Sequence, residues 1–209
     1  MRSKAGIVLM FLGAALLSGA LLLFLFNQKQ DDQAAEAAVQ VLPQLVEQIQ
    51  ANTPETDETD LSMDLLIPEE LLTEEDVAME EMEVDGNGYI GYVTLPALDL
   101  ELPVQGSWSY PKLRISPCRY TGTLRGGNLV IMAHNYWSHF GKLSQLQVGD
   151  NVYFTDITGR VTQFAVMAKD ILEPTAVEEI TRGDFDLTLF TCTYGGASRV
   201  TVFCDKVTE

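Results

Sequence analysis

An unbroken apolar run near the start of the chain is its clearest pattern. Residues 5 to 26 carry no charged side chain. As a helix rising about 1.5 Å per residue, this run would reach roughly 33 Å, and the hydrocarbon core of a bilayer is about 30 Å thick. A cleaved signal peptide has a shorter apolar region that ends near a small-x-small site, whereas the nearest such site here, Ala35-Glu36-Ala37, lies well beyond the run. The pattern therefore predicts an uncleaved anchor over residues 1–26.

From Gly86 onward, short runs rich in β-branched and aromatic residues are separated by Gly, Asn and Asp. The runs that predict strands are 89–95, 100–104, 129–133, 151–155, 161–168, 187–192 and 199–207. One short helix is expected through 136–146. Many short strands at this spacing are typical of a β-sandwich or β-barrel, so the pattern predicts a mainly β domain over residues 86–209.

Charge divides the chain into three parts. Residues 27–85 hold 18 of the 30 acidic residues and one of the 13 basic residues, so most of the net charge of −17 resides there and the C-terminal domain is nearly neutral. This composition predicts an acidic juxtamembrane spacer, partly helical or disordered, in which Pro43 would interrupt or kink a helix. An alternative is that the apolar stretch Leu61 to Leu72 folds back over the active site as a lid.

The charges that flank the apolar run predict its orientation. Arg2 and Lys4 precede the run, and Asp31 and Asp32 follow it closely behind Lys29. By the positive-inside rule the N-terminus is cytoplasmic and the rest of the chain lies outside the membrane. An acidic chain of this kind has no basic surface for nucleic acid, so that class of partner is excluded.

The first candidate for a catalytic residue is Cys192, which ends the apolar strand expected over 187–192. If Gly195 and Gly196 are the centre of a tight hairpin, the register places Cys192 directly opposite Arg199. Opposed residues of an antiparallel pair project from the same face, with Cβ atoms about 4.5 to 5.5 Å apart. A guanidinium beside a thiol favours the thiolate and can also stabilise negative charge on a substrate oxygen.

A second apolar strand, 129–133, ends on His134 in the same way. If the two strands are parallel neighbours, His134 and Cys192 emerge at the same end of the sheet, where one histidine can serve as base and acid for a thiol nucleophile. His139 is the rival base, but it lacks the position at a strand end. The spacing of His and Cys residues matches no metal motif, so no metal is expected. A bridge between Cys118 and Cys204 is left open.

These residues together resemble the sortases, the membrane-anchored cysteine transpeptidases of Gram-positive bacteria. Thr188-Leu189-Phe190-Thr191-Cys192 matches the TLxTC signature of the family, Arg199 matches the arginine on the next strand, and His134 matches the family histidine. The similarity extends over about residues 86–209. Ala133 stands where the family usually has Gly, and the interval from Cys192 to Arg199 is short relative to many members.

The subclass is left open by the residues around this signature. His134-Asn135 is similar to class B sortases, whereas the anchor, the spacer and the Leu143 to Asp150 region are closer to class A or class D. The resemblance implies an eight-stranded sortase β-barrel with short helices, preceded by the transmembrane helix and the spacer. It also implies a protein of the cell membrane whose catalytic domain lies outside.

The resemblance further implies a reaction and a role for each site residue. Cys192 would attack the carbonyl after Thr in an LPxTG-like sorting signal, and a peptidoglycan precursor or a pilin amine would resolve the thioester. His134 would protonate the leaving amine and deprotonate the incoming one, Arg199 would hold the substrate backbone or the oxyanion, and Thr191 would contact substrate. No cofactor is implied. The alternatives are a hydrolytic cysteine peptidase and a non-enzymatic, membrane-tethered binding domain.

Overall fold

The computed structural model describes residues 2–52 and 79–207, with side chains from residue 6 onward. The helices are α1 Arg2–Asn52, η3 Pro96–Leu98, α3 Tyr110–Leu113, η4 Phe140–Gln145, α4 Val177–Thr181 and η5 Tyr194–Gly196. The strands are β1 Met82–Val84, β2 Asn87–Leu95, β3 Leu100–Gln105, β4 Cys118–Thr121, β5 Leu129–Ala133, β6 Asn151–Asp156, β7 Val161–Leu172, β8 Leu187–Cys192 and β9 Arg199–Lys206.

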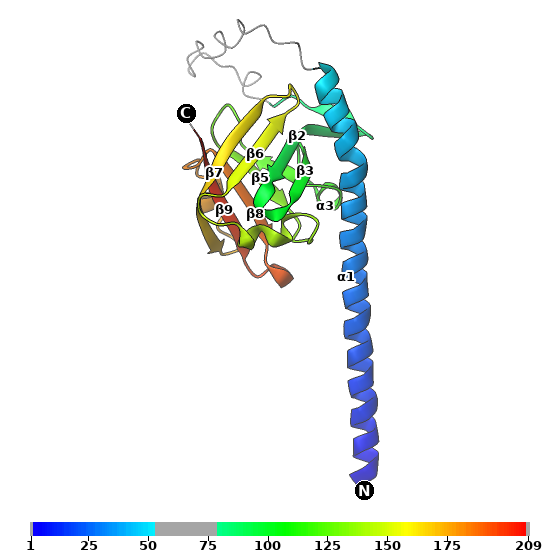
Figure 1. Cartoon of the computed structure of the whole chain (residues 1–209). Helices are drawn as coiled ribbons and strands as arrows, with labels where there is room; N and C mark the ends of the chain where they lie inside the picture. The colour runs from blue at the N-terminus through cyan, green and yellow to red at the C-terminus, as the bar shows by residue number, and fades with distance from the viewer. Residues whose placement is uncertain (1, 53–78, 208–209) are drawn as a thin grey trace, which may run out of the picture.

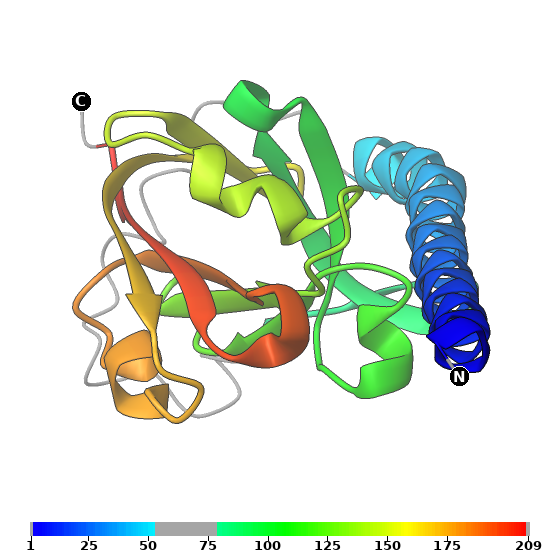
Figure 2. The ribbon, with the colours of Figure 1, turned by 90° about the horizontal axis from the view of Figure 1, so that it is seen from below.

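Eight of these strands close into a barrel, as the resemblance implied. The neighbours follow the order β2-β3-β4-β5-β8-β9-β7-β6, and β6 pairs with β2 to complete the circle. β1 adds to the outside of β2 as a hairpin. Figures 1 and 2 show the barrel beside one long helix, with β8 and β9 on the side away from β2. Closure removes the free edges that an open sheet would expose.

The closure depends on a glycine in β2. Gly91 has φ +138 and pairs with Asp156 of β6. A Cβ atom built at this position would lie 2.0 Å from the carbonyl oxygen of Thr155, so no other residue fits without moving the backbone. The approach of β6 to β2 therefore requires glycine at this point.

Alternation along the strands gives the barrel wall two distinct faces. Leu129, Ile131, Leu187 and Leu189 point into the main core, which also contains Phe154 and Phe164 of β6 and β7. The residues between them point outward, where Val130 and Phe190 pack with Ile180 of α4 as a smaller apolar cluster. The outward face of β5 and β8 is thus covered by α4 and its loop.

The helix α1 joins the predicted anchor to the barrel without a break. Its apolar N-terminal part is exposed, and among the described residues it is the one helix long and apolar enough to cross a bilayer, with a mean hydropathy of 2.6. Beyond it, Ala34, Ala38, Val41, Leu45 and Ile49 recur at helical spacing and are buried against β1, β2 and β3. The N-terminal part of the expected spacer is therefore helical and packed on the barrel.

Pro43 lies inside this helix and does not end it, whereas the sequence predicted an interruption or a kink. A proline in a helix removes the hydrogen bond to the carbonyl four residues earlier, which here belongs to Val39. The Val39 side chain is 71% exposed, on the side of α1 away from the barrel, where water can satisfy that carbonyl. Val41 and Leu45 on either side are buried, so packing holds the helix together.

Most predicted strands are confirmed within a few residues. The strands 129–133 and 187–192 have the predicted bounds, and β7 extends four residues further than predicted. β1, β4, α3 and α4 were not predicted, and the expected helix 136–146 is the shorter η4. Residues 61–72, the proposed lid, lie outside the described residues. Cys118 and Cys204 are both free and buried, so the bridge left open by the sequence is not formed.

Candidate active site

The β8–β9 hairpin has the predicted register. Cys192 pairs with Arg199 and Thr191 pairs with Val200. The turn itself is longer than the predicted two-residue turn: the amide of Thr193 donates to the Ser198 carbonyl (2.9 Å), and the amide of Gly196 donates to the Thr193 carbonyl (2.8 Å). The predicted turn and the observed turn are both centred between Gly195 and Gly196, so Cys192 faces Arg199 in either case.

His134 and Cys192 follow the paired ends of β5 and β8, which are parallel neighbours. The register pairs Ala133 with Thr191, so the residues that follow, His134 and Cys192, leave the two strands at the same height. Neighbouring strands lie about 4.8 Å apart. Ala133 points into the core and Phe190 into the outer cluster, so by alternation both His134 and Cys192 project from the outward face. Both residues are partly exposed.

The Arg199 guanidinium lies along the turn. Nη1 donates to the carbonyls of Gly196 and Ser198, each at 3.2 Å. Arg199 is partly exposed, and its remaining donors are available to a bound group. A positive charge is therefore held at the mouth of the hairpin, beside the strand end that carries the thiol.

Thr191 takes a different position from the one predicted for a substrate contact. The residue is 3% exposed, and its hydroxyl donates to the carbonyl of Ala133 at 2.9 Å. It alternates with Cys192 and so faces the inside of the barrel wall. Its hydrogen bond ties the end of β8 to the residue before His134, which favours a positioning role over a substrate contact.

The imidazole of His134 is kept neutral by its surroundings. Its ring packs against Tyr136, with centroids 4.9 Å apart. Burial lowers the pKa of His134 below its ordinary value, and the nearby positive charge of Arg114 lowers it further. A neutral imidazole near pH 7 can take a proton from a thiol or an amine, which is what a base in this position requires.

His139, the rival base, lies behind Tyr136 in the interior. It is fully buried, and its ring centroid is 5.5 Å from that of Tyr136. Neither ring nitrogen makes a hydrogen bond of good geometry among the described residues. Burial lowers the pKa of His139 to about 4, and the charge of His134 adds to this effect, while Asp31 and the Ile115 backbone oppose it. A buried, neutral ring without access to substrate is a poor base for the reaction.

Acid is expected to destabilise the fold through His139. Its pKa is about 6.5 in an unfolded chain and about 4 in the structure, so between these values the unfolded state binds the proton more readily. Stability should be full above about pH 6.5 and fall as the pH approaches 4, by on the order of 3 kcal/mol. Unfolding free energies across this range should fall less steeply for His139→Gln than for the wild type. Equal slopes would contradict the assignment.

The first polar turns of α1 hold the loop that follows His134, which the sequence did not predict. The carboxylate of Asp31 accepts hydrogen bonds from the amides of Trp137 (3.2 Å) and Ser138 (2.9 Å) and from the Ser138 hydroxyl. The Tyr136 hydroxyl donates to Gln30 at 3.0 Å. Because Tyr136 packs on His134, α1 positions the base through this loop. No spacing in the sequence indicates a contact between residues about a hundred positions apart.

Loss of the Asp31 carboxylate is expected to slow turnover roughly tenfold. Asp31→Ala leaves the Trp137 and Ser138 amides without their acceptor and leaves the Ser138 hydroxyl with the backbone carbonyl of residue 31 alone, which costs about 1–3 kcal/mol locally and frees the loop that carries Tyr136. Because His134 then loses its neighbour, the pH profile of kcat should shift towards the ordinary histidine value while KM changes little. Asp32→Ala removes the same charge at the next, exposed position and is the matched control. Identical pH profiles for the two variants would contradict a positioning role.

A cleft adjoins the outward face of the site. It has a volume of about 370 Å³ and is lined by Gly106, Ser107, Trp108, Arg119, Tyr120 and Thr121. Trp108 packs on Tyr120 (centroids 6.0 Å), and Tyr120 packs edge-on against Phe190 (5.5 Å). Phe190 is two residues before Cys192 on the same face. A row of aromatic rings thus leads from the cleft towards the strand that carries the thiol, and neither Trp108 nor Tyr120 belongs to a motif in the sequence.

The other two cysteines and the metal-binding residue types offer no second centre in the described part of the chain. Burial raises the pKa of the Cys118 thiol and of the Cys204 thiol to about 12. Within residues 2–52 and 79–207, no group of three His, Cys, Asp or Glu side chains is placed to hold a metal ion. The arrangement at the end of β5 and β8 therefore suits nucleophilic chemistry by Cys192.

Comparison with known proteins points to one family. The family model described as Sortase domain matches residues 93–207. Among solved structures, sortase C1 from Streptococcus suis is 26% identical, with a TM-score of 0.53, and covers 58% of this chain and 74% of its own. Sortase C from Streptococcus pneumoniae is 25% identical, with a TM-score of 0.51, and covers 61% and 72%. Sortase A from Corynebacterium diphtheriae shares the fold, with a TM-score of 0.51. It is 22% identical and covers 59% of this chain and 62% of its own. A search of curated proteins found no match.

Proposed function

The chain belongs to the sortase family, since the family match spans more than half of it, and we propose that it cleaves an LPxTG-like sorting signal and transfers the carried protein to an amine. The observation that supports this proposal is the parallel pairing of β5 with β8, because His134 and Cys192 directly follow the last paired residues of these strands and both are partly exposed. The neutral imidazole and the guanidinium at the hairpin mouth are what such a reaction needs.

In the first half of the reaction, the Cys192 sulfur attacks the carbonyl carbon of the scissile peptide bond. His134 takes the thiol proton and delivers it to the nitrogen of the departing peptide as the C–N bond breaks. The Arg199 donors stabilise the negative charge on the carbonyl oxygen while the tetrahedral intermediate exists. The product is a thioester between the substrate acyl group and Cys192.

In the second half, an amine attacks the thioester carbon. His134 accepts the proton that the amine loses, the C–S bond breaks, and the proton returns to the sulfur. The amine comes from a peptidoglycan precursor or a pilin. Thr191, through its bond to Ala133, holds the two strand ends together during both steps. Trp108 and Tyr120, with the buried Phe190 packed behind Tyr120, offer a surface on which the extended sorting signal can lie.

The exposed apolar part of α1 is consistent with a single-pass anchor. We propose that α1 crosses the cell membrane with Arg2 and Lys4 on the cytoplasmic side, so that the barrel lies outside. In that compartment both the sorting signal and the acceptor amine are accessible to Cys192.

The reaction can be tested on the full chain reconstituted in lipid nanodiscs. LPxTG-like peptides are added with and without a candidate amine, and mass spectrometry follows the protein and the products. A thioester on Cys192 and a new amide support the proposal. Acid product alone, with or without amine, would favour the hydrolytic peptidase. If no thioester forms on Cys192 with any peptide of the series, the proposed reaction is wrong and the domain acts by binding.

Arg199→Lys is expected to lower kcat/KM by roughly 10- to 100-fold. Lysine keeps the charge but lacks the planar guanidinium, whose several N–H groups can donate to the carbonyls of the turn and to a substrate oxygen at the same time. Arg182→Lys is the matched control, because Arg182 is exposed and pairs with Asp184 on the β7–β8 loop (3.6 Å). Wild-type activity in Arg199→Lys would remove Arg199 from the catalytic set.

A further inference from the structure

The end of the barrel at which β5 and β8 finish, with His134 and Cys192, is the catalytic end. It is held at one height along α1. Three contacts set this height: Asn27 donates to the Tyr194 hydroxyl (3.5 Å), the Tyr136 hydroxyl donates to Gln30 (3.0 Å), and the Ser138 amide donates to Asp31 (2.9 Å). Tyr194 lies in the turn that follows Cys192, and the other two partners lie in the loop that follows His134. Both catalytic strand ends are therefore tied to residues 27–31 of one continuous helix.

That height can be compared with the layers of a bilayer. The apolar run ends at Phe26, so the contacts at Asn27 and Asp31 lie about 1.5 and 7.5 Å beyond the hydrocarbon boundary, at 1.5 Å per residue. The headgroup layer is roughly 5 to 7.5 Å thick on each side. A helix tilt of about 20° shortens these heights by less than about 1 Å when they are measured along the helix axis, and it moves side chains on one face of the helix by roughly 2 Å. The catalytic end thus lies within the headgroup layer.

The surface at this end has the chemistry of a membrane interface. Tyr194 is 85% exposed and Trp137 is 62% exposed. Tyr and Trp are the residues enriched at the headgroup level, where one part of the ring system is apolar and the other is wet. Ile171, 68% exposed, pairs with Val200 and so lies at the same end of the barrel. Figure 2 views the molecule from this side, with the β8–β9 turn towards the viewer.

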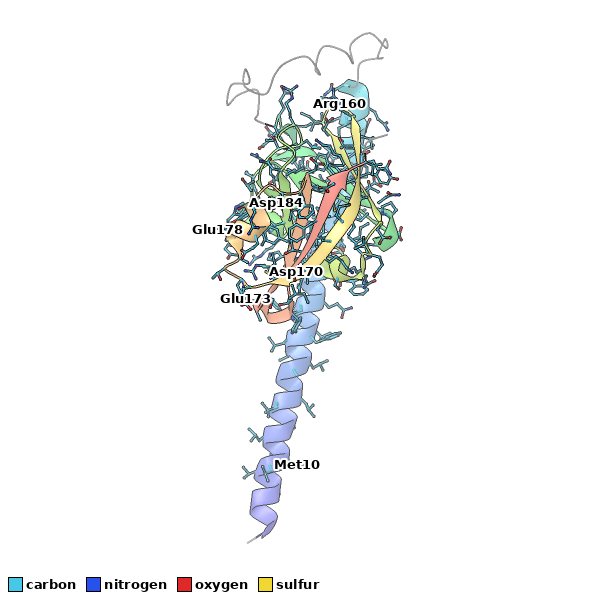
Figure 3. All side chains as sticks on the ribbon, turned by 90° about the vertical axis from the view of Figure 1, so that its left-hand side faces the viewer. Met10, Arg160, Asp170, Glu173, Glu178 and Asp184 are labelled. Carbon is cyan, nitrogen blue, oxygen red and sulfur yellow. The ribbon has the colours of Figure 1, made fainter. Side chains whose placement is uncertain are left out.

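Electrostatic attraction to anionic lipid does not explain how this surface would contact a membrane. Figure 3 shows Asp170 and Glu173 at the end of the barrel from which the apolar part of α1 projects, and Arg160 at the opposite end. Both acidic residues are exposed. Anionic lipid would repel them, so contact with the bilayer depends on the anchor and the aromatic side chains.

We propose that the catalytic end of the barrel docks on the headgroup layer of the membrane that holds α1, with Tyr194 and Trp137 among the headgroups. The inference rests on the proposed single-pass anchor. Docking keeps the thiol of Cys192 at the level where a membrane-embedded polypeptide first leaves the bilayer. The substrate class that fits this geometry is a chain whose cleavage site lies at the bilayer surface.

Depth-dependent fluorescence quenching of the full chain in phosphatidylcholine nanodiscs tests the docking. Trp108→Phe leaves Trp137 as the single tryptophan of the chain, which has two. The height control carries Trp108→Phe, Trp137→Phe and Val161→Trp. Val161 begins β7, eleven residues before Leu172 of the catalytic end, or about 36 Å along the strand. Lipids brominated near the top of the acyl chain should quench Trp137 roughly twofold or more and leave the Val161→Trp reporter unchanged.

Two further measurements separate the outcomes. Tyr194→Glu, which places a charge at the headgroup level, should reduce the quenching of Trp137. If Trp137 is quenched no more than the control while α1 resists alkaline extraction, the docking is wrong and the proposed function is unaffected. If α1 is extracted, both the anchor and the docking are wrong. If Trp137 is quenched but discs that carry the wild-type chain form no thioester, the docking is supported and the proposed reaction fails.

Discussion

Cys192→Ala is expected to abolish thioester formation and peptide transfer completely. No other described side chain can replace the sulfur, because Cys118 and Cys204 are buried in the barrel and their pKa values are raised to about 12. Thiols of this kind remain protonated and inaccessible near neutral pH. Intact-mass spectrometry after incubation with an LPxTG-like peptide should show the acyl adduct on the wild type and no adduct on the variant.

Thiol labelling gives this prediction a matched control. A small alkylating reagent should modify the folded wild type once, at the partly exposed Cys192, and should leave Cys192→Ala unlabelled. Cys118→Ala removes a buried thiol of similar size and should keep both the single label and the acyl adduct. An acyl adduct on Cys192→Ala, or its loss in Cys118→Ala, would show that the nucleophile has been assigned to the wrong residue.

The register of the catalytic strands was predictable because it depends on local rules. Turn symmetry about Gly195-Gly196 placed Cys192 opposite Arg199, and the longer turn in the structure keeps the same centre. The match between two apolar strands that end on His134 and Cys192 led to the hypothesis that they are parallel neighbours, and the structure pairs them in parallel. Period-two alternation then determines which residues share a face.

The surroundings of the site were not predictable, because they depend on distant segments. Asp31 was interpreted only as a charge after the membrane helix, yet it holds the loop next to His134. Pro43 predicted an interruption or a kink, yet α1 continues through it, because packing of its neighbours on the barrel overrides the local preference. The β4 strand is short and begins after Pro117, so its pattern is too weak to indicate that Tyr120 would join the cleft to Phe190.

His134→Ala is expected to lower the rate of acyl-enzyme formation by about a thousandfold. The change removes the group that takes the thiol proton and delivers it to the leaving amine, and general acid–base catalysis of this kind contributes about 10²- to 10⁴-fold. The single-turnover rate with a peptide substrate is the measurement, because it reports the first half of the reaction alone. Alkylation of Cys192 should persist in the variant, which distinguishes loss of proton transfer from loss of the fold.

His139→Gln is the matched comparison for this variant. His139 is fully buried behind Tyr136, so it cannot reach a substrate nitrogen, and a glutamine there keeps a polar side chain of similar length. We expect its rate to stay within about threefold of the wild type near pH 7, where His139 is already neutral. Equal losses in the two variants would contradict a single base. A large loss in His139→Gln alone would transfer the role of the base to His139 and require the Tyr136 loop to open during the reaction.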